Sequence, residues 1–160
     1  MGYSGYEWLW LFFAYSFSGW VLETVTAAVR QKRFVNRGLV NGPLCVIYGI
    51  TGSALMLVCR DLRGIWLFLG SMILASGIEY FTGAALEKIF HKRWWDYSNH
   101  RFHLNGYVCL RYAFVWGIFG TFSMYLGNHL LLTAVSFIPH MVGFVLLIVL
   151  GVLLGCDVLG

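Results

Sequence analysis

The chain has 160 residues, of which 59% are hydrophobic, 18% aromatic and 11% charged. A typical soluble domain carries about 25% charged residues. A chain this short cannot bury so much apolar surface in one water-soluble core, because small domains leave a large share of their surface exposed. The composition therefore excludes an ordinary cytosolic enzyme, a disordered regulator and a secreted disulfide scaffold. It predicts an all-α, polytopic membrane helical bundle.

Five segments are long and apolar enough to cross a bilayer, which takes about 20 mostly apolar residues. They cover residues 8–29, 43–59, 65–86, 107–127 and 141–159. Glu7 precedes the first apolar run and no basic stretch does, so we expect that helix to be retained rather than removed as a signal peptide.

The segment between the fourth and fifth predicted helices, residues 128–140, is ambiguous. Its apolar part is too short to span a bilayer. It either lies at the membrane interface, re-enters the membrane, or extends the fourth helix as far as Ser136. Pro139 is expected to begin the last helix.

The distribution of basic residues predicts how the chain is oriented, because Lys and Arg collect in cytoplasmic loops. Four of them follow the first predicted helix and four follow the third, whereas two follow the second and none lies in 128–140. This pattern places the N-terminus outside and the C-terminus in the cytoplasm of a cell-membrane protein. The basic residues of these cytoplasmic loops also account for the formal net charge of +4, so no nucleic-acid partner is expected.

Two stretches of similar sequence indicate an internal repeat. Residues 46–53 resemble residues 114–121, with Gly-x-x-Gly in both. Upstream, each copy carries one glutamate after a Ser-Gly pair, Glu23 in the first and Glu79 in the second.

An Asn-Gly pair followed by a cysteine also recurs, ending at Cys45 in one copy and at Cys109 in the other. The second copy has four extra residues, about one helical turn, between its cysteine and the first shared glycine. We therefore predict a parallel repeat about an axis along the membrane normal, with copies at about 8–59 and 65–127 and an extra helix at about 141–159.

The two glutamates are the strongest functional signals, because an ionisable group in hydrocarbon costs several kcal/mol and must face protein or water. Small residues share the helix face of each glutamate and allow close helix packing. Two carboxylates at similar depth on equivalent helices could face each other across the repeat axis. They form either a proton or cation relay, a pocket for a cationic group, or a structural pair with an Arg or Asn from a loop.

Two polar loops add further candidates. Asn41 is a plausible N-cap beside Arg37, and a helix N-terminus with an arginine can bind an anion such as a lipid phosphate. The alternative is a structured connector in which Arg37 reaches back to Glu23. In the second loop, Asp96 with two nearby histidines is not a diagnostic metal spacing, and we expect Asp96 to pair with an arginine instead.

No motif in the chain indicates catalysis. The four cysteines form no CxxC pair, and GxxxxGK[ST], GxSxG and HExxH are absent. We assign no catalytic residue, metal or cofactor. The candidate substrate or ion pocket comprises Glu23, Glu79, Arg37, Asn41, Asn105, Asp96, Tyr15 and Ser16.

At these residues the chain resembles the ABC-transporter permease family of the type IV, CmpB-like kind. The matching pieces run from residue 12 to about 120: Phe12-x-x-Tyr15-Ser16-Phe17-x-Gly19-Trp20-x-x-Glu23, Arg33-Phe-Val-Asn-Arg-Gly38, Gly42-Pro43-x-Cys45-x-Ile47-Tyr48-Gly49, Trp95-Asp96-Tyr97-Ser98, Asn105-Gly106 with Cys109-Leu110, and Trp116-Gly117. Two positions depart from the family pattern, Val46 in place of proline and His103 in place of asparagine.

The resemblance implies a membrane-embedded permease component that works in the lipid bilayer as a homodimer or with a separate ATP-binding subunit. Two other functions are compatible with the residues. One is an intramembrane enzyme or binder of lipid head groups, and the other is a structural or regulatory subunit whose glutamates only hold helices together.

Overall fold

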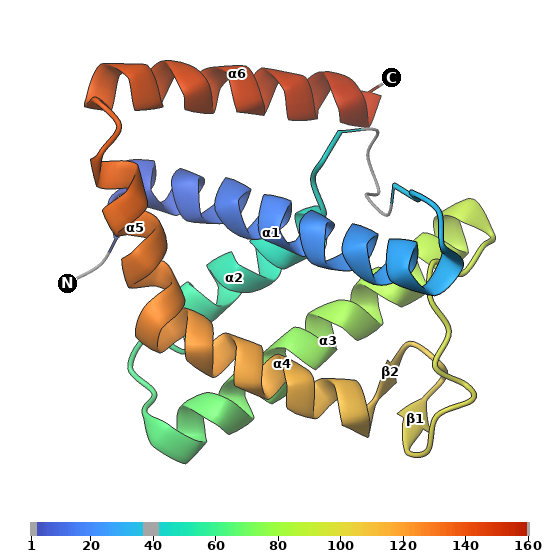
Figure 1. Ribbon diagram of the computed structural model, residues 1–160. Coiled ribbons are helices and arrows are strands. Elements are labelled where there is room, and N and C mark those ends of the chain that lie inside the picture. The colour runs from blue at the N-terminus through green and yellow to red at the C-terminus, as the bar shows by residue number, and fades with distance from the viewer. Residues whose placement is uncertain (1–2, 37–41, 160) are drawn as a thin grey trace. The chain divides into compact units, whose positions relative to one another are not determined.

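A computed structural model describes residues 3–36 and 42–159 of the chain (Figure 1). The chain divides into two compact units, Met1–Ser53 with Gly127–Gly160, and Ala54–Leu126. The helices are α1 (Gly5–Gln31), α2 (Val46–Val58), α3 (Gly64–Phe90), α4 (Leu110–Phe122), α5 (Asn128–Ser136) and α6 (His140–Leu159). The predicted all-α architecture is confirmed apart from one short hairpin.

The first unit is built on α1, against which α5 and α6 pack. Ser4 begins α1 with a capping box: its hydroxyl accepts from the Glu7 N–H, and the Glu7 carboxylate accepts from the Ser4 N–H at 2.7 Å. Phe13, Leu44 and Leu147 form the buried core of this unit. Most of α6 remains exposed, as expected of a helix whose apolar surface faces lipid.

The second unit is dominated by the packing of α3 along α4. Its buried core contains Leu55, Cys59 and Leu67. The buried residues of α3 recur every four positions, which places them on one face of the helix: Leu67, Ser71, Ala75, Glu79 and Gly83.

Three helices within the described ranges are long and apolar enough to cross a membrane, judged by length and composition: Gly64–Phe90, Leu110–Ser136 and His140–Val158. The prediction of five spanning helices is therefore confirmed for three. Helix α1 has the length, with 27 residues, but its Trp, Tyr and Ser side chains and Glu23 make it less apolar. Helix α2 has 13 residues and begins at Val46, three residues after the predicted start at Pro43.

The ambiguous segment after residue 127 extends the fourth helix. A π-helical turn, η1 (Ser123–Gly127), joins α4 to α5, so the chain is helical from Leu110 to Ser136. Of the three alternatives, extension as far as Ser136 is the one observed. Helix α6 begins at His140, directly after Pro139, as the sequence predicts.

The predicted start of the fourth helix at residue 107 is wrong, because those residues belong to a hairpin. Strand β1 (His103–Leu104) pairs antiparallel with β2 (Val108–Cys109), and α4 begins at Leu110. Asn105 and Gly106 form the turn with φ of 52° and 75°. An Asn-Gly pair tolerates positive φ and is a strong hairpin signal.

The two longest helices end in the same way. Lys32 follows α1 with φ of 50°, and His91 follows α3 with φ of 53°, both in the left-handed region. At a helix C-terminus, the residue in this conformation is usually glycine.

Candidate functional site

Glu23 lies on α1 in the first unit and accepts a hydrogen bond from α2. The Tyr48 hydroxyl donates to Oε1 of Glu23 at 2.8 Å. Gly19 lies one turn before Glu23, and a Cβ there would overlap the Tyr48 ring. The small residue therefore lets the ring approach α1 closely enough for its hydroxyl to reach the carboxylate.

Glu79 lies on α3 in the second unit and is 6% exposed. Two aromatic side chains donate to it. The Tyr97 hydroxyl lies 3.0 Å from Oε1, and the Trp116 indole nitrogen lies 2.9 Å from Oε2. A buried carboxylate requires such partners, because an unpaired charge away from water is costly.

The donors Tyr48 and Trp116 occupy matching positions, since each directly precedes the first glycine of a Gly-x-x-Gly sequence. From Glu23 to Glu79 is 56 residues, and from Tyr48 to Trp116 is 68. The same sequence pattern therefore brings an aromatic donor to a helix glutamate twice.

Two contacts made by glycines recur in the same way, with the glycines 68 residues apart and their partners 56 residues apart. A Cβ at Gly49 would lie 2.9 Å from the Phe12 ring, and one at Gly117 would lie 2.7 Å from the Phe68 ring. In the second pair, a Cβ at Gly52 would contact the Tyr15 side chain, and a Cβ at Gly120 would contact the Ser71 side chain.

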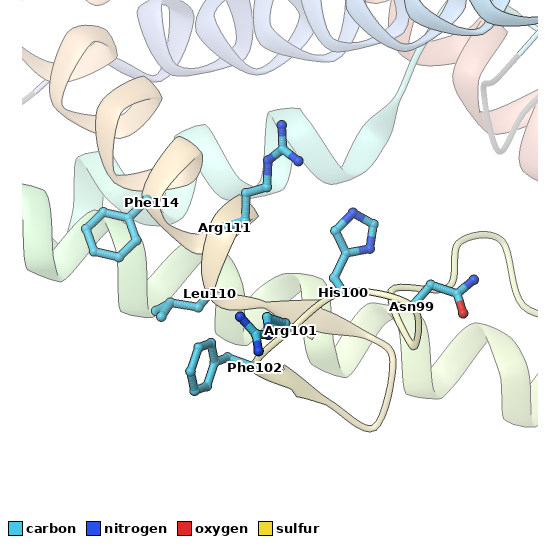
Figure 2. Close-up of a pocket in the computed structure, with 7 residues that line it drawn as sticks. All are labelled: Asn99, His100, Arg101, Phe102, Leu110, Arg111 and Phe114. Atoms are coloured by element: carbon cyan, nitrogen blue, oxygen red, sulfur yellow. The ribbon is translucent and has the colours of Figure 1, made fainter.

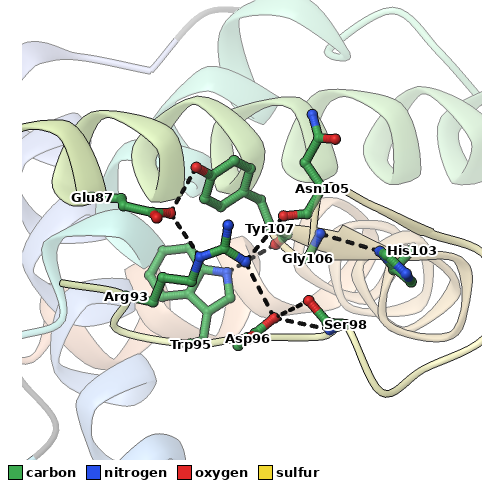
Figure 3. A network of polar contacts seen from close by, with 9 residues as sticks. All are labelled: Glu87, Arg93, Trp95, Asp96, Ser98, His103, Asn105, Gly106 and Tyr107. Carbon is green, nitrogen blue, oxygen red and sulfur yellow. Dashed lines mark hydrogen bonds and ion pairs between the residues drawn. The ribbon is translucent and has the colours of Figure 1, made fainter. Parts of the chain in front are cut away.

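A polar network built around Arg93 holds the loop that follows α3 (Figure 3). Arg93 Nε lies 2.8 Å from the Glu87 carboxylate, and its Nη1 reaches Asp96 at 3.4 Å and the Asn105 carbonyl at 3.2 Å. The Tyr107 hydroxyl donates to the same Glu87 carboxylate at 2.7 Å. The guanidinium also lies 5.0 Å from the centre of the Tyr107 ring. The expected pairing of Asp96 with an arginine is confirmed.

Neighbouring contacts fix the rest of the loop (Figure 3). The Ser98 N–H and hydroxyl both donate to Asp96, at 2.9 and 2.5 Å. The Trp95 indole donates to the Tyr107 carbonyl at 2.8 Å, and His103 Nδ1 accepts from the Gly106 N–H at 3.2 Å. The histidine at the position where the family pattern has asparagine therefore stabilises the hairpin turn.

The network shifts the pKa values of its members in directions that keep it intact near neutral pH. Burial would lower the pKa of Arg93, but the carboxylates of Glu87 and Asp96 outweigh this and raise it. The hydroxyl and N–H of Ser98, with Arg93, hold the pKa of Asp96 below its usual value. The hydrogen bond to Glu87, with burial, raises the pKa of Tyr107.

The other predicted pocket residues fall into separate places. The Tyr15 hydroxyl donates to Asn128 at 2.5 Å within the first unit, and Asn128 donates in turn to the Tyr3 hydroxyl at 2.9 Å. Ser16 is fully buried, and its hydroxyl has no hydrogen-bond partner among the described residues. Asn105 donates to the Tyr80 hydroxyl at 2.9 Å.

The candidate residues thus belong to groups that lie in different units. Arg93 brings Asp96 together with the Asn105 backbone, whereas Tyr15 and Ser16 lie with Glu23 on α1. Arg37 and Asn41 lie outside the described residues, as does the predicted contact of Arg37 with Glu23. Within residues 3–36 and 42–159, no group of three or more His, Cys, Asp or Glu side chains could hold a metal ion.

Sequence reasoning missed the aromatic donors Tyr48, Tyr97 and Trp116. A signal for two of them was present, because Tyr48 and Trp116 stand at one position of the repeated pattern. Arg93 carried no comparable signal, since it is one of several basic residues after α3. Asn128 lies in the ambiguous segment 128–140, and the sequence did not indicate its hydrogen bonds to Tyr3 and Tyr15.

Comparison with known proteins agrees with the membrane helices. The family described as "Putative ABC-transporter type IV" matches residues 10–160. No curated protein and no solved structure matches the chain. The helices and the family together identify a membrane protein related to ABC-transporter components. Because the match covers nearly the whole sequence, the chain belongs to the Putative ABC-transporter type IV family.

Proposed function

We propose that the chain is the permease subunit of an ABC transporter and that Glu23 and Glu79 are the polar groups of its substrate or ion path. The observation that carries this proposal is the matched setting of the two carboxylates. Each lies on a long helix and accepts a hydrogen bond from an aromatic side chain at a corresponding position. An ionisable residue among apolar helices is costly to keep and marks a functional site by default.

A parallel internal repeat underlies this setting. The recurrence of three contacts at constant sequence displacement supports it: Glu23 with Tyr48, Gly49 with Phe12, and Gly52 with Tyr15 each have a counterpart in the second unit. Chance similarity between glycine-rich helices would reproduce a short motif but not the same partners on the neighbouring helix. In this proposal α1 and α3 are equivalent elements, so α1 also spans the membrane despite its lower hydropathy.

The energy for transport would come from a separate ATP-binding subunit, because the chain lacks a phosphate-binding GxxxxGK[ST] sequence. The loop around Arg93 is a suitable docking element. It is rigidified by its own network. The basic residues around it support a position on the cytoplasmic side of the membrane. A homodimer would supply the further helices that a substrate path needs.

The first experiment is purification from the native membrane in mild detergent, followed by native mass spectrometry. We expect a complex with a stoichiometric ATP-binding subunit. A lone chain, or a homodimer carrying only lipid, would overturn the permease proposal in favour of a lipid-binding function.

The second experiment measures ATP hydrolysis by that complex in proteoliposomes with Glu23→Gln and Glu79→Gln variants. Glutamine removes the charge and keeps one oxygen that accepts from Tyr48 or Trp116. At position 79 its amide N–H can donate to the Tyr97 hydroxyl, which then accepts, so the fold should be retained. We expect both variants to lose coupled hydrolysis, whereas the matched variant Glu7→Gln, at the start of α1, should retain it. Normal hydrolysis in both variants would assign the glutamates a structural role only.

A further inference from the structure

An open depression lies between α4 and the loop that precedes the hairpin in the second unit (Figure 2). Its volume is about 460 Å³. The lining includes Arg101 and His100 from the loop and Arg111 from the first turn of α4. The lining residues include no carboxylate. Figure 2 shows Arg111 and His100 extending to the same side, with Arg101 beside Leu110 and Phe102.

The two arginines of the depression differ in their partners from Arg93, which lies in the same loop as Arg101. Arg93 contacts two carboxylates and a carbonyl, whereas neither Arg101 nor Arg111 forms an ion pair or hydrogen bond with any described residue. Both are exposed. Two free cations lining one depression create a positive potential that attracts anions.

The N-terminus of α4 adds to this positive potential. A cation in the first turn of a helix is unfavourable, because it adds to the positive end of the macrodipole. Arg111 occupies this place, no acidic residue stands in the first turn, and the N-cap residue Cys109 provides no side-chain hydrogen bond. A bound anion would relieve the repulsion and accept from the helix N–H groups.

His100, in the lining, has a buried nitrogen, Nδ1, without a hydrogen-bond partner among the described residues. The ring is held in place, since its centre lies 5.7 Å from the rings of both Tyr97 and Tyr112. Ordered aromatic contacts therefore fix this edge of the depression.

The apolar part of the lining indicates the rest of the ligand. Phe102 is 79% exposed, and Phe114 is 49% exposed on a helix that is long and apolar enough to span a membrane. Leu110 lies one turn before Phe114 on the same helix. A positive rim beside exposed aromatic side chains suits a phosphate group that carries apolar chains.

We propose that this depression binds the phosphate group of an anionic ligand through Arg101 and Arg111, next to an apolar contact made by Phe102 and Phe114. The phosphate belongs either to a phospholipid head group or to a free phosphate. The proposal does not depend on transport activity.

The test uses the purified full chain in detergent and native mass spectrometry with phosphatidylglycerol, phosphatidylcholine and inorganic phosphate as probes. We expect phosphatidylglycerol to bind about tenfold more tightly than phosphatidylcholine, because phosphatidylcholine carries the same phosphate together with a trimethylammonium cation that the two arginines repel. The Arg101→Gln/Arg111→Gln variant should remove this preference. The control Arg60→Gln/Arg63→Gln has the same change in charge in another loop and should keep it.

Because Arg101 and Arg111 make no polar contacts within the described protein, the variant should fold normally. Undiminished binding by it, or an equal loss in the control, would overturn the proposal. Phe114→Ala distinguishes the two sources of phosphate. A weaker affinity for phosphatidylglycerol without competition by inorganic phosphate identifies the lipid, whereas full competition and no effect of Phe114→Ala identify the free ion.

Discussion

Trp116 donates its indole N–H to the Glu79 carboxylate at 2.9 Å, from the position that Tyr48 occupies relative to Glu23. An indole and a phenol have different shapes but present one donor each. Both positions therefore bring a hydrogen-bond donor to a helix carboxylate, with a different ring in each case.

The second donor to Glu79 can be tested with a matched pair of tyrosines. Tyr97 and Tyr112 stack with ring centres 4.8 Å apart, but only the Tyr97 hydroxyl donates to Glu79. Tyr97→Phe should cost about 1 kcal/mol, because one hydrogen bond to a buried carboxylate is lost. Thermal unfolding in detergent should show a Tm lower by about 2–4 °C. Tyr112→Phe should leave the Tm unchanged, and an equal loss in both variants would contradict the role of Tyr97.

The Asp96 carboxylate should make stability depend on pH. Its pKa is held below the usual 3.8 by Ser98 and Arg93, so the ionised form stabilises the fold above that pH. This contribution is lost as the pH falls through the lowered pKa. Asp96→Asn should therefore have a lower Tm than the unchanged chain at pH 7, and the difference should close under acid conditions. A difference that stays constant down to low pH would show that the charge of Asp96 contributes nothing.

Close packing of α3 on α4 should make one glycine sensitive and another tolerant. A Cβ at Gly120 would collide with the Cβ and hydroxyl of Ser71, whereas no atom of the described residues lies within 4 Å of a Cβ at Gly77. Gly120→Ala should destabilise the protein by about 1–3 kcal/mol through overpacking. Gly77→Ala should stabilise it by about 0.5–1 kcal/mol, because alanine favours a helix interior. Thermal unfolding of the two variants side by side measures both effects, and similar Tm values would argue against the close approach at Gly120.

The orientation in the membrane can be measured by cysteine labelling. Cys45, Cys59 and Cys109 are buried, so a Cys156→Ser background has low reactivity. Lys92→Cys lies in the loop expected in the cytoplasm, and Asp61→Cys lies in the loop expected outside. A membrane-impermeant maleimide should label Asp61→Cys in intact cells and Lys92→Cys only after permeabilisation. The reverse pattern would invert the topology.

The sequence was sufficient to predict most helices because apolar length dominates the signal in a membrane protein. It misjudged residues 107–109, because the apolar run that begins at Tyr107 was assigned to the fourth helix and the Asn105-Gly106 pair before it was interpreted only as part of the predicted repeat. The same pair is a hairpin turn, with both residues at positive φ. A local signal was present there but had two interpretations.

Long-range contacts explain the remaining differences. Asn128 begins the segment that the sequence leaves ambiguous, and its amide is satisfied by Tyr3 and Tyr15, which lie more than 100 residues earlier in the chain. Arg93 acts through partners on α3 and on the hairpin turn. No periodicity in the sequence identifies such partners, because they are determined by packing of the whole unit.

The ends of α1 and α3 show where an engineer can add stability. Lys32 and His91 hold left-handed conformations that cost a side-chain-bearing residue about 1 kcal/mol or more, and glycine relieves this cost. Lys32→Gly and His91→Gly together should raise the Tm without touching Glu23, Glu79 or the Arg93 network. The two substitutions thus provide a more robust sample of the same protein for experimental structure determination in detergent.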